Sequence, residues 1–267
     1  MNSEQVNVFL VGSGPGDPDL LTVKAHRLIR EAEVVVIDRL VSDQILDIIP
    51  PNTSRVYVGK KPGNHHHSQE EINEILVRLG QSGRKVVRLK GGDPYIFGRG
   101  SEEAEHLIDN NIPFEVVPGI TAAQGCGSLN GIPLTHRGYS TGVRFVTGHR
   151  RNDGDLGLNW ASLACEQTTL VVYMGVSSIG IIAEKLMENG LPASTPVAAI
   201  EKGLSEDERR LTSSLNNIHH DVVEADFQPP TLFIIGKVVS LADKLNWQND
   251  TWETNDEPYK EQRYAAL

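Results

Sequence analysis

A glycine pair followed by an acidic residue has the chemistry to hold a small ligand. The run RLKGGDPYIFGRG occupies residues 88–100. Paired glycines let the backbone approach a ligand at positive φ, Asp93 adds an anionic acceptor, and Pro94 stiffens the turn. Residues 85–89 before them are typical of a buried strand, and α/β sheets bind ligands beyond the carboxyl ends of strands. An ordinary strand-to-helix turn could use the same GGDP residues, so both interpretations stay open.

Two ionisable side chains lie just after expected strands. Asp38 follows the expected strand at 33–37, where a carboxylate could act as a base. Lys60 follows a short expected strand at 56–58. The residues alone allow an ion pair or a loop cap at Asp38 as readily as a base, and they favour a surface lysine at position 60.

A second glycine loop, GSGPGD at residues 12–17, follows the first expected strand. A dinucleotide-binding fingerprint requires G-x-G-x-x-G, but Asp17 occupies the third glycine position here and Pro15 interrupts the loop. Aspartate repels a pyrophosphate and proline lacks an N–H donor. The loop therefore argues against an NAD-dependent oxidoreductase, which we keep as an alternative.

Composition excludes several classes of protein. The 267-residue chain is 39% apolar and has a net charge of −10, which argues against a nucleic-acid partner. Cys126 and Cys165 form no C-x-x-C motif and cannot make a disulfide framework, as is typical of a reducing cytoplasm. No apolar run approaches the roughly 20 residues of a spanning helix. We therefore predict a cytoplasmic protein without a membrane partner.

Three adjacent histidines at residues 65–67 invite a metal interpretation, but sequence neighbours do not point at one ion. They are better explained as a polar loop before a helix at 69–79, which Ser68 and Glu71 open as a capping box. No metal site is predicted.

The order of strands and helices predicts an α/β fold with two α/β domains. We expect an N-terminal domain at 1–135, a C-terminal domain at 136–247 and a loose polar tail at 248–267. Expected strands are 7–11, 33–37, 56–58, 85–89, 114–117, 143–147, 168–173, 196–200, 210–212 and 231–235. Expected helices are 22–32, 69–79, 102–110, 120–129, 179–189 and 239–245.

Four stretches together resemble the tetrapyrrole methylase family. They are residues 88–100, VGSGPGDP at 11–18, DRLVS at 38–42, and VPGITAA at 117–123 running on to GIPLTHR at 131–137. They stand in the family's order and spacing, and the resemblance extends from Val6 to about Trp247. It implies a class III methyltransferase fold with a cofactor cleft between the two domains, and a homodimer.

The resemblance also implies an activity and its residues. The reaction is two methyl transfers from S-adenosylmethionine to carbons 2 and 7 of uroporphyrinogen III, giving precorrin-2 for sirohaem, cobalamin or haem d1. The family assigns the proton acceptor to Asp38 and the donor to Lys60. Cofactor contacts at matching positions are Pro15, Gly91, Gly92, Asp93, Ile96, Thr121, Ala122, Met174 and Gly203. The eight substrate carboxylates call for basic side chains, and candidates near the loops are Arg39, Lys61, Arg99, Arg137, Arg150 and Arg151.

Other members of the family act on a later corrin precursor, a diphthine intermediate or ribosomal RNA. The GGDPYIFGRG and GIPLTHR strings favour the early tetrapyrrole substrate, and the acidic charge disfavours RNA. Some relatives carry a dehydrogenase-chelatase module before the methylase, and we expect none because the sequence starts at the first methylase strand. A non-catalytic tetrapyrrole- or nucleoside-binding module is a further alternative, against which Asp38 and Lys60 together argue.

Overall fold

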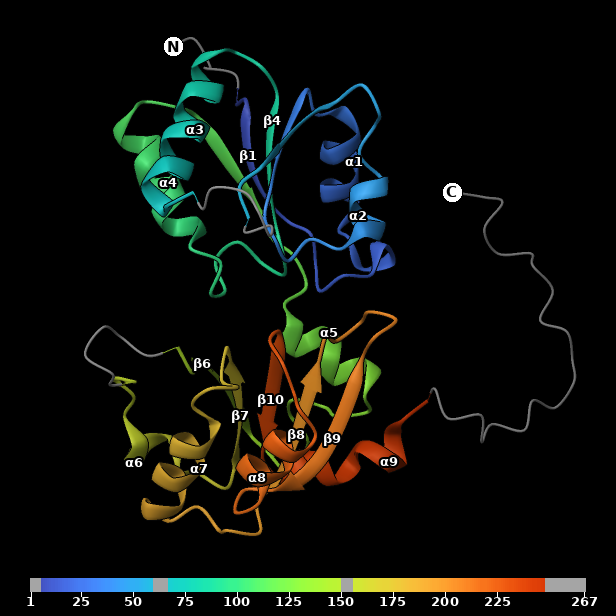
Figure 1. The fold of residues 1–267 in the computed structure, drawn as a ribbon, viewed down its shortest axis with the longest axis vertical. Coiled ribbons are helices and arrows are strands. Elements are labelled where there is room, and N and C mark those ends of the chain that lie inside the picture. Colours follow the sequence, from blue (N-terminus) through green and yellow to red (C-terminus); the bar gives the residue numbers. More distant parts are fainter. Residues whose placement is uncertain (1–5, 60–66, 150–155, 248–267) are drawn as a thin grey trace, which may run out of the picture.

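The computed structural model describes residues 6–59, 67–149 and 156–247, which form two α/β halves stacked along the long axis (Figure 1). Each half is built on a five-stranded sheet. The predicted fold class is confirmed. No helix in the described ranges is long and apolar enough to cross a membrane.

The first sheet is entirely parallel, with the strand order β3-β2-β4-β1-β5. Its strands are β1 (Val8–Gly12), β2 (Val34–Ile37), β3 (Ser54–Tyr57), β4 (Val86–Lys90) and β5 (Phe114–Val117). The interior strands β2, β4 and β1 are buried along their whole length. Their nearly continuous apolar runs suit this position, because helices cover both faces of a parallel sheet.

Two pairs of helices cover the first sheet. One face packs against α1 (Val23–Glu31) and α2 (Asp43–Asp47), and the other against α3 (Gln69–Gln81) and α4 (Gly100–Asp109) (Figure 1). The short helix η1 (Pro18–Leu20) lies between β1 and α1. The predicted capping box at the start of α3 is confirmed: Ser68 Oγ accepts from Glu71 N, and the Glu71 carboxylate accepts from Ser68 N.

The second sheet is mixed, with the strand order β6-β7-β10-β8-β9. Its strands are β6 (Gly142–Thr147), β7 (Thr168–Tyr173), β8 (Pro196–Glu201), β9 (Arg209–Ser214) and β10 (Thr231–Ile235). Strands β6 and β7 pair in parallel, whereas β10 runs antiparallel to β7 and β8. The edge strand expected at 210–212 is confirmed as part of β9, which pairs antiparallel with β8.

Helices also cover both faces of the second sheet. One face packs against α6 (Trp160–Leu163), α7 (Ile179–Glu188) and α8 (Ile218–Glu224). The other packs against α5 (Ala122–Leu129) and the C-terminal η2 (Lys237–Leu241). The last helix, α9 (Ala242–Leu245), follows η2 directly. Helix α5 therefore packs on the second sheet, although it lies inside the N-terminal range 1–135 that the sequence suggested.

Several local expectations differ from the structure. Helix α4 begins at Gly100, two residues before the start expected from the sequence, and follows Arg99 in the left-handed conformation. The helix expected at 239–245 is divided into η2 and α9. The short helices α2 and α8 were not expected, because five and seven residues give too little periodicity to identify.

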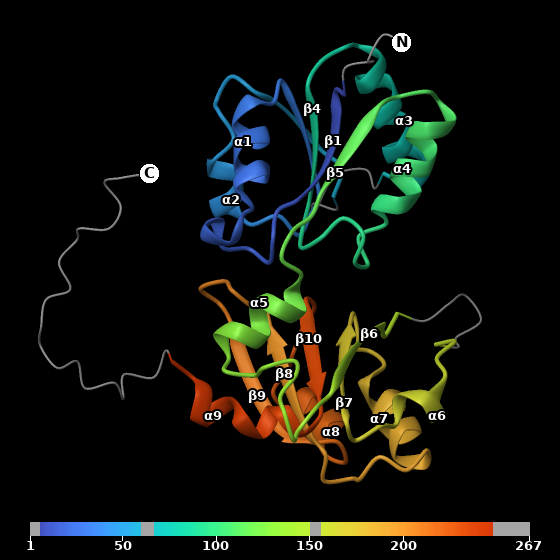
Figure 2. The ribbon, with the colours of Figure 1, turned by 180° about the vertical axis from the view of Figure 1, so that it is seen from behind.

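The carboxyl ends of the two sheets face each other. The strands of the first sheet end toward the second half, and β6, β7 and β8 end toward the first (Figures 1 and 2). Ligands of α/β folds bind at such ends. We use the name interdomain junction for the loops that meet there, at residues 13–17, 38–42, 91–99, 118–121, 174–175 and 202–208.

Candidate active site

The two glycine loops lie against each other at the interdomain junction. Gly92 N donates to Gly14 O at 2.7 Å, and Gly14 N donates to Gly92 O at 3.1 Å. A Cβ on Gly12 would lie 2.6 Å from Gly92 O and 2.7 Å from Gly119 N, so no side chain fits between these backbones. The backbones of three motifs that are distant in sequence, those of Gly12, Gly92 and Gly119, are thus in direct contact.

The DRLVS segment closes the same region from another side. Ser42 Oγ donates to Gly16 O at 2.5 Å and also caps α2 by accepting from Ile45 N. A Cβ on Gly91 would lie 2.8 Å from Leu40 Cβ. The first three stretches and the VPGITAA part of the fourth therefore meet at the interdomain junction.

The Asp93 side chain holds two turns together. Its Oδ2 accepts from Gly119 N at 3.0 Å, and its Oδ1 accepts from Tyr95 N at 2.8 Å. Both carboxylate oxygens are therefore bound to backbone amides of the protein. This arrangement fixes the GGDP loop relative to the turn that leads into α5.

Tyr173 connects the two halves and was not identified from the sequence. Its hydroxyl lies 2.6 Å from Thr121 Oγ1 and accepts from Ala123 N at 3.0 Å. Its ring lies against Phe97 of the first half, with 4.9 Å between centroids. Burial raises the pKa of Tyr173, so its hydroxyl stays protonated. The only sequence signal was an aromatic residue at the end of a strand, directly before Met174.

The loops of the interdomain junction contain strained backbone. Residues with a side chain rarely adopt φ between +20° and +160°, and such strain clusters at functional sites. Met174 has φ of 55° and a half-exposed side chain. The junction residues of this kind are Phe97, Arg99, Met174, Lys202 and Leu204.

Helix α5 is held tightly between the two halves. A Cβ on Gly125 would lie 2.6 Å from Pro15 Cγ, which places the GSGPGD loop directly on the helix. A Cβ on Gly203 would collide with Cys126 Sγ on the same helix. Glu208 fixes the Gly203 loop by accepting from Leu204 N at 2.6 Å and Asn130 Nδ2 at 2.9 Å.

The candidate base Asp38 is held from one side and open on the other. Its Oδ2 lies 3.3 Å from Arg88 Nη2, its Oδ1 accepts from Arg39 N at 2.8 Å, and 37% of its side chain is exposed. Behind it, Arg88 Nε and Lys90 Nζ both bind Glu103 Oε1, at 3.0 and 2.8 Å. Burial, followed by the charge of Arg88, lowers the pKa of Lys90.

The ion pairs of Arg88, Lys90 and Glu103 were not predicted from the sequence, although the sequence contains a sign of them. Arg88 and Lys90 are charged residues at alternate positions of an otherwise apolar strand, and both are only 2% exposed.

The structure separates the proposed substrate-binding residues. Arg39 and Arg99 are exposed at the interdomain junction, and Arg99 forms a two-pronged contact with Glu102 at 2.6 and 2.8 Å. Arg137 lies in the loop that enters β6, at the end of the second sheet away from the junction. Lys61, Arg150 and Arg151, together with the candidate acid Lys60, lie outside the described residues.

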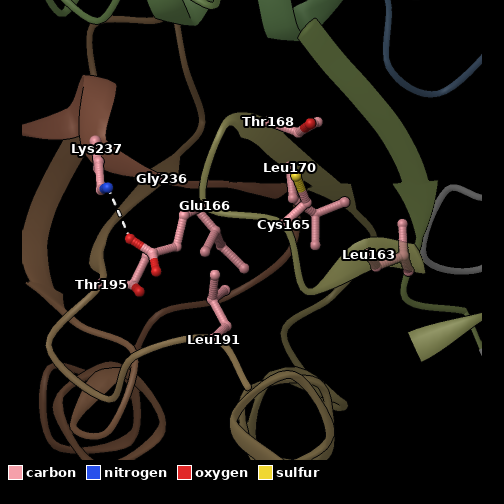
Figure 3. Close-up of a pocket in the computed structure, with 10 residues that line it drawn as sticks. Leu163, Cys165, Glu166, Thr168, Leu170, Leu191, Thr195, Gly236 and Lys237 are labelled. Atoms are coloured by element: carbon pink, nitrogen blue, oxygen red, sulfur yellow. Dashed lines mark ion pairs between the residues drawn. The ribbon is translucent and has the colours of Figure 1, made fainter. Parts of the chain in front are cut away.

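Two hollows lie away from the junction. Figure 3 shows a pocket of about 10 Å³ beside Thr168 at the start of β7, where Glu166 and Lys237 form an ion pair at 2.7 Å. The volume suits about one water molecule. A wider groove of about 410 Å³ lies along α7 and α8. Neither is lined by a candidate catalytic, cofactor-binding or substrate-binding residue.

Known proteins resemble most of this chain. Residues 7–219 match the family model described as Tetrapyrrole (Corrin/Porphyrin) Methylases. Siroheme synthase 2 of Yersinia enterocolitica is 50% identical over 245 residues, which are 92% of this chain and 51% of that protein. The chain thus spans about half the length of the curated relatives it matches.

Solved structures give a second comparison. Native uroporphyrin III C-methyltransferase from Thermus thermophilus is 42% identical with a TM-score of 0.75, covering 88% of this chain and 99% of that chain. A second structure of the Thermus thermophilus enzyme, complexed with S-adenosylhomocysteine, matches with the same values.

Proposed function

This chain belongs to the tetrapyrrole (corrin/porphyrin) methylase family, and we propose that it transfers methyl groups from S-adenosylmethionine to carbons 2 and 7 of uroporphyrinogen III. The product is precorrin-2. The observation that carries this proposal is the 42% identity to uroporphyrin III C-methyltransferase over 99% of that enzyme's chain. The siroheme synthase relatives support sirohaem as the pathway that uses the product.

The junction fits S-adenosylmethionine, which supplies an electrophilic methyl group on a sulfonium when bound. A Cβ on Gly92 would have only Thr121 Cα near it, at 3.9 Å, so this backbone is open to a ligand. Met174 and Ile96 add partly exposed apolar side chains. Asp93 would contribute through its backbone, because both carboxylate oxygens are engaged. The proposed cofactor contacts are Pro15, Gly91, Gly92, Asp93, Ile96, Thr121, Ala122, Met174 and Gly203.

Asp38 is the proposed acceptor of the proton that leaves the macrocycle. Its carboxylate is partly exposed, and Asp38 belongs to the 38–42 segment of the interdomain junction, which supports this role. Lys60 is the proposed donor. The proposed partners of the substrate carboxylates are Arg39, Arg99, Lys61, Arg150 and Arg151. Arg137 is not included, because it lies at the end of the second sheet away from the junction.

The protein is proposed to act as a cytoplasmic homodimer without nucleic-acid or membrane partners. The net charge of −10 supports the absence of nucleic acid, and the family supports the dimer. Light scattering on the purified chain tests the dimer directly. A monomer at micromolar concentration would refute it.

Anaerobic incubation with uroporphyrinogen III and methyl-labelled S-adenosylmethionine tests the activity. Two labels per macrocycle are expected. The Asp38→Asn variant should bind S-adenosylhomocysteine normally and fail to label. An enzyme that labels a later corrin precursor but not uroporphyrinogen III would point to the alternative within the family, and reduction of a nicotinamide nucleotide would point to an oxidoreductase.

A further inference from the structure

Three charged side chains are buried behind the candidate base. Arg88 and Lys90 project from β4, and Glu103 projects from α4 to meet them. The exposed fractions are 2%, 2% and 0%, so water reaches none of the three. We call these residues the buried charge cluster.

Stability alone explains this cluster poorly. Arg88 and Lys90 lie on the face of β4 that Val86 shares, where the surrounding residues are apolar. Buried ion pairs often stabilise a protein no better than apolar residues of similar size, because both charges lose their hydration. Both cations also converge on Glu103 Oε1, and Glu103 Oε2 has no hydrogen-bond partner among the described residues. A group selected only for stability would use both oxygens.

The geometry of Arg88 suggests a different role. Its guanidinium is a planar fork whose Nε binds Glu103 at 3.0 Å while its Nη2 reaches Asp38 Oδ2 at 3.3 Å. Arg88 is therefore fixed at its buried end and presents one N–H donor to the partly exposed carboxylate. Glu103 forms no ion pair or hydrogen bond with Asp38 in the described structure, so it acts on that residue through Arg88.

We propose that Arg88 is a positioning residue that holds the Asp38 carboxylate in place for proton acceptance, and that Glu103 orients Arg88. The role in catalysis rests on the proposed function, in which Asp38 accepts a proton from the macrocycle. A base must stay within hydrogen-bond reach of that proton, and a displacement of about 1 Å can lower a rate by about 100-fold. An anchored guanidinium prevents the Asp38 side chain from turning away.

The Arg88→Lys variant tests whether the forked shape of the guanidinium is needed in addition to its positive charge. A lysine keeps the positive charge, but one ammonium cannot replace both arms of the guanidinium. We expect kcat for methyl transfer to fall on the order of 10- to 100-fold, which is at most the lower end of the roughly 100- to 10,000-fold contribution of a general base, because Asp38 itself is still present. The KM for uroporphyrinogen III and the affinity for S-adenosylhomocysteine should stay within about threefold.

Lys90→Met is the matched control. Lys90 is equally buried and binds the same oxygen of Glu103, but it makes no ion pair with Asp38 in the described structure. Its variant should keep kcat within about threefold of the wild type. Equal kcat losses in the two variants would overturn the proposal. A loss of S-adenosylhomocysteine affinity in Arg88→Lys that matches its loss of kcat would do the same, since it would indicate general structural damage.

A second measurement needs no substrate. Urea unfolding of the wild type, Arg88→Lys, Asp38→Asn and the double variant forms a cycle that reports the contact itself. If Arg88 holds Asp38, Asp38→Asn shifts the midpoint less in the Arg88→Lys background than in the wild type. Additive shifts would refute the contact. A wild-type enzyme that transfers no methyl group would instead refute the proposed function, and the cycle would still decide whether Arg88 holds Asp38.

Discussion

The Tyr173 hydroxyl on β7 lies 2.6 Å from Thr121 Oγ1, at the residue that precedes α5. Thr121 makes no capping bond with its own helix, and the same hydroxyl accepts from Ala123 N in the first turn. A free amide in the first turn of a helix usually binds the side chain of the N-cap residue. Here a residue about fifty positions later in the chain supplies that acceptor. The start of α5 therefore depends on the end of β7.

We expect Tyr173→Phe to weaken both folding and cofactor binding. The variant leaves one helix amide without its acceptor, which should lower the free energy of unfolding by about 1–2 kcal/mol. Because Thr121 and Ala122 are proposed cofactor contacts, affinity for S-adenosylhomocysteine should also fall. Urea unfolding and calorimetry measure the two effects. Tyr139→Phe, at an exposed tyrosine in the loop before β6, is the control and should change neither.

Gly92→Ala should remove cofactor binding beyond its cost in stability. Gly92 has φ of 67°, where an added Cβ strains the backbone by roughly 1–2 kcal/mol. Gly83 has φ of 71° and nothing within 4 Å of an added Cβ, so Gly83→Ala carries the same strain away from the junction. Both variants should unfold at similarly lowered urea concentrations, but only Gly92→Ala should lose S-adenosylhomocysteine binding. Equal affinities in the two variants would mean that the proposed site is misplaced.

Alkaline conditions should destabilise the protein through Cys126. Burial, with a smaller contribution from Glu208, raises the pKa of this thiol to about 12. The unfolded chain loses the proton near its ordinary pKa of about 8.5, whereas the folded protein keeps it. The stabilising effect is complete below that pH and declines by about 1.4 kcal/mol per pH unit until the folded thiol ionises. Unfolding free energies measured from pH 8 to 10 should therefore fall more steeply for the wild type than for Cys126→Ala, and parallel curves would contradict this assignment.

Arg99→Ala and Arg137→Ala should have different effects on substrate affinity. Arg99 lies at the interdomain junction with more than half of its side chain exposed, whereas Arg137 lies at the far end of the second sheet. Removing Arg99 should raise the KM for uroporphyrinogen III with little effect on stability, because exposed ion pairs contribute about 0–1 kcal/mol. Arg137→Ala should leave the KM unchanged. Steady-state kinetics measure both KM values. A raised KM in Arg137→Ala but not in Arg99→Ala would mean that the substrate binds at the far end of the second sheet and not at the junction.

The sequence predicted the fold and the loops because those features depend on local signals. Apolar runs defined β1, β2 and β4, and the Ser68–Glu71 spacing located the start of α3. The contacts of Tyr173 and Arg88 could not be predicted in this way, because their partners come from other elements of the fold. Arg137 illustrates the same limit, since closeness to a motif in sequence does not reveal the end of the sheet at which a loop lies.

In the described ranges the chain passes from the first sheet to the second only between β5 and α5, so each sheet is made from one continuous stretch. During translation the ribosome completes β1 to β5 before any strand of the second sheet emerges. The first sheet can therefore form while synthesis continues, as N-terminal domains generally do. Tyr173 and Gly203 can reach the glycine loops only after β10 has been made, because β10 lies between β7 and β8 in the second sheet. The proposed methyl-transfer site is therefore assembled last.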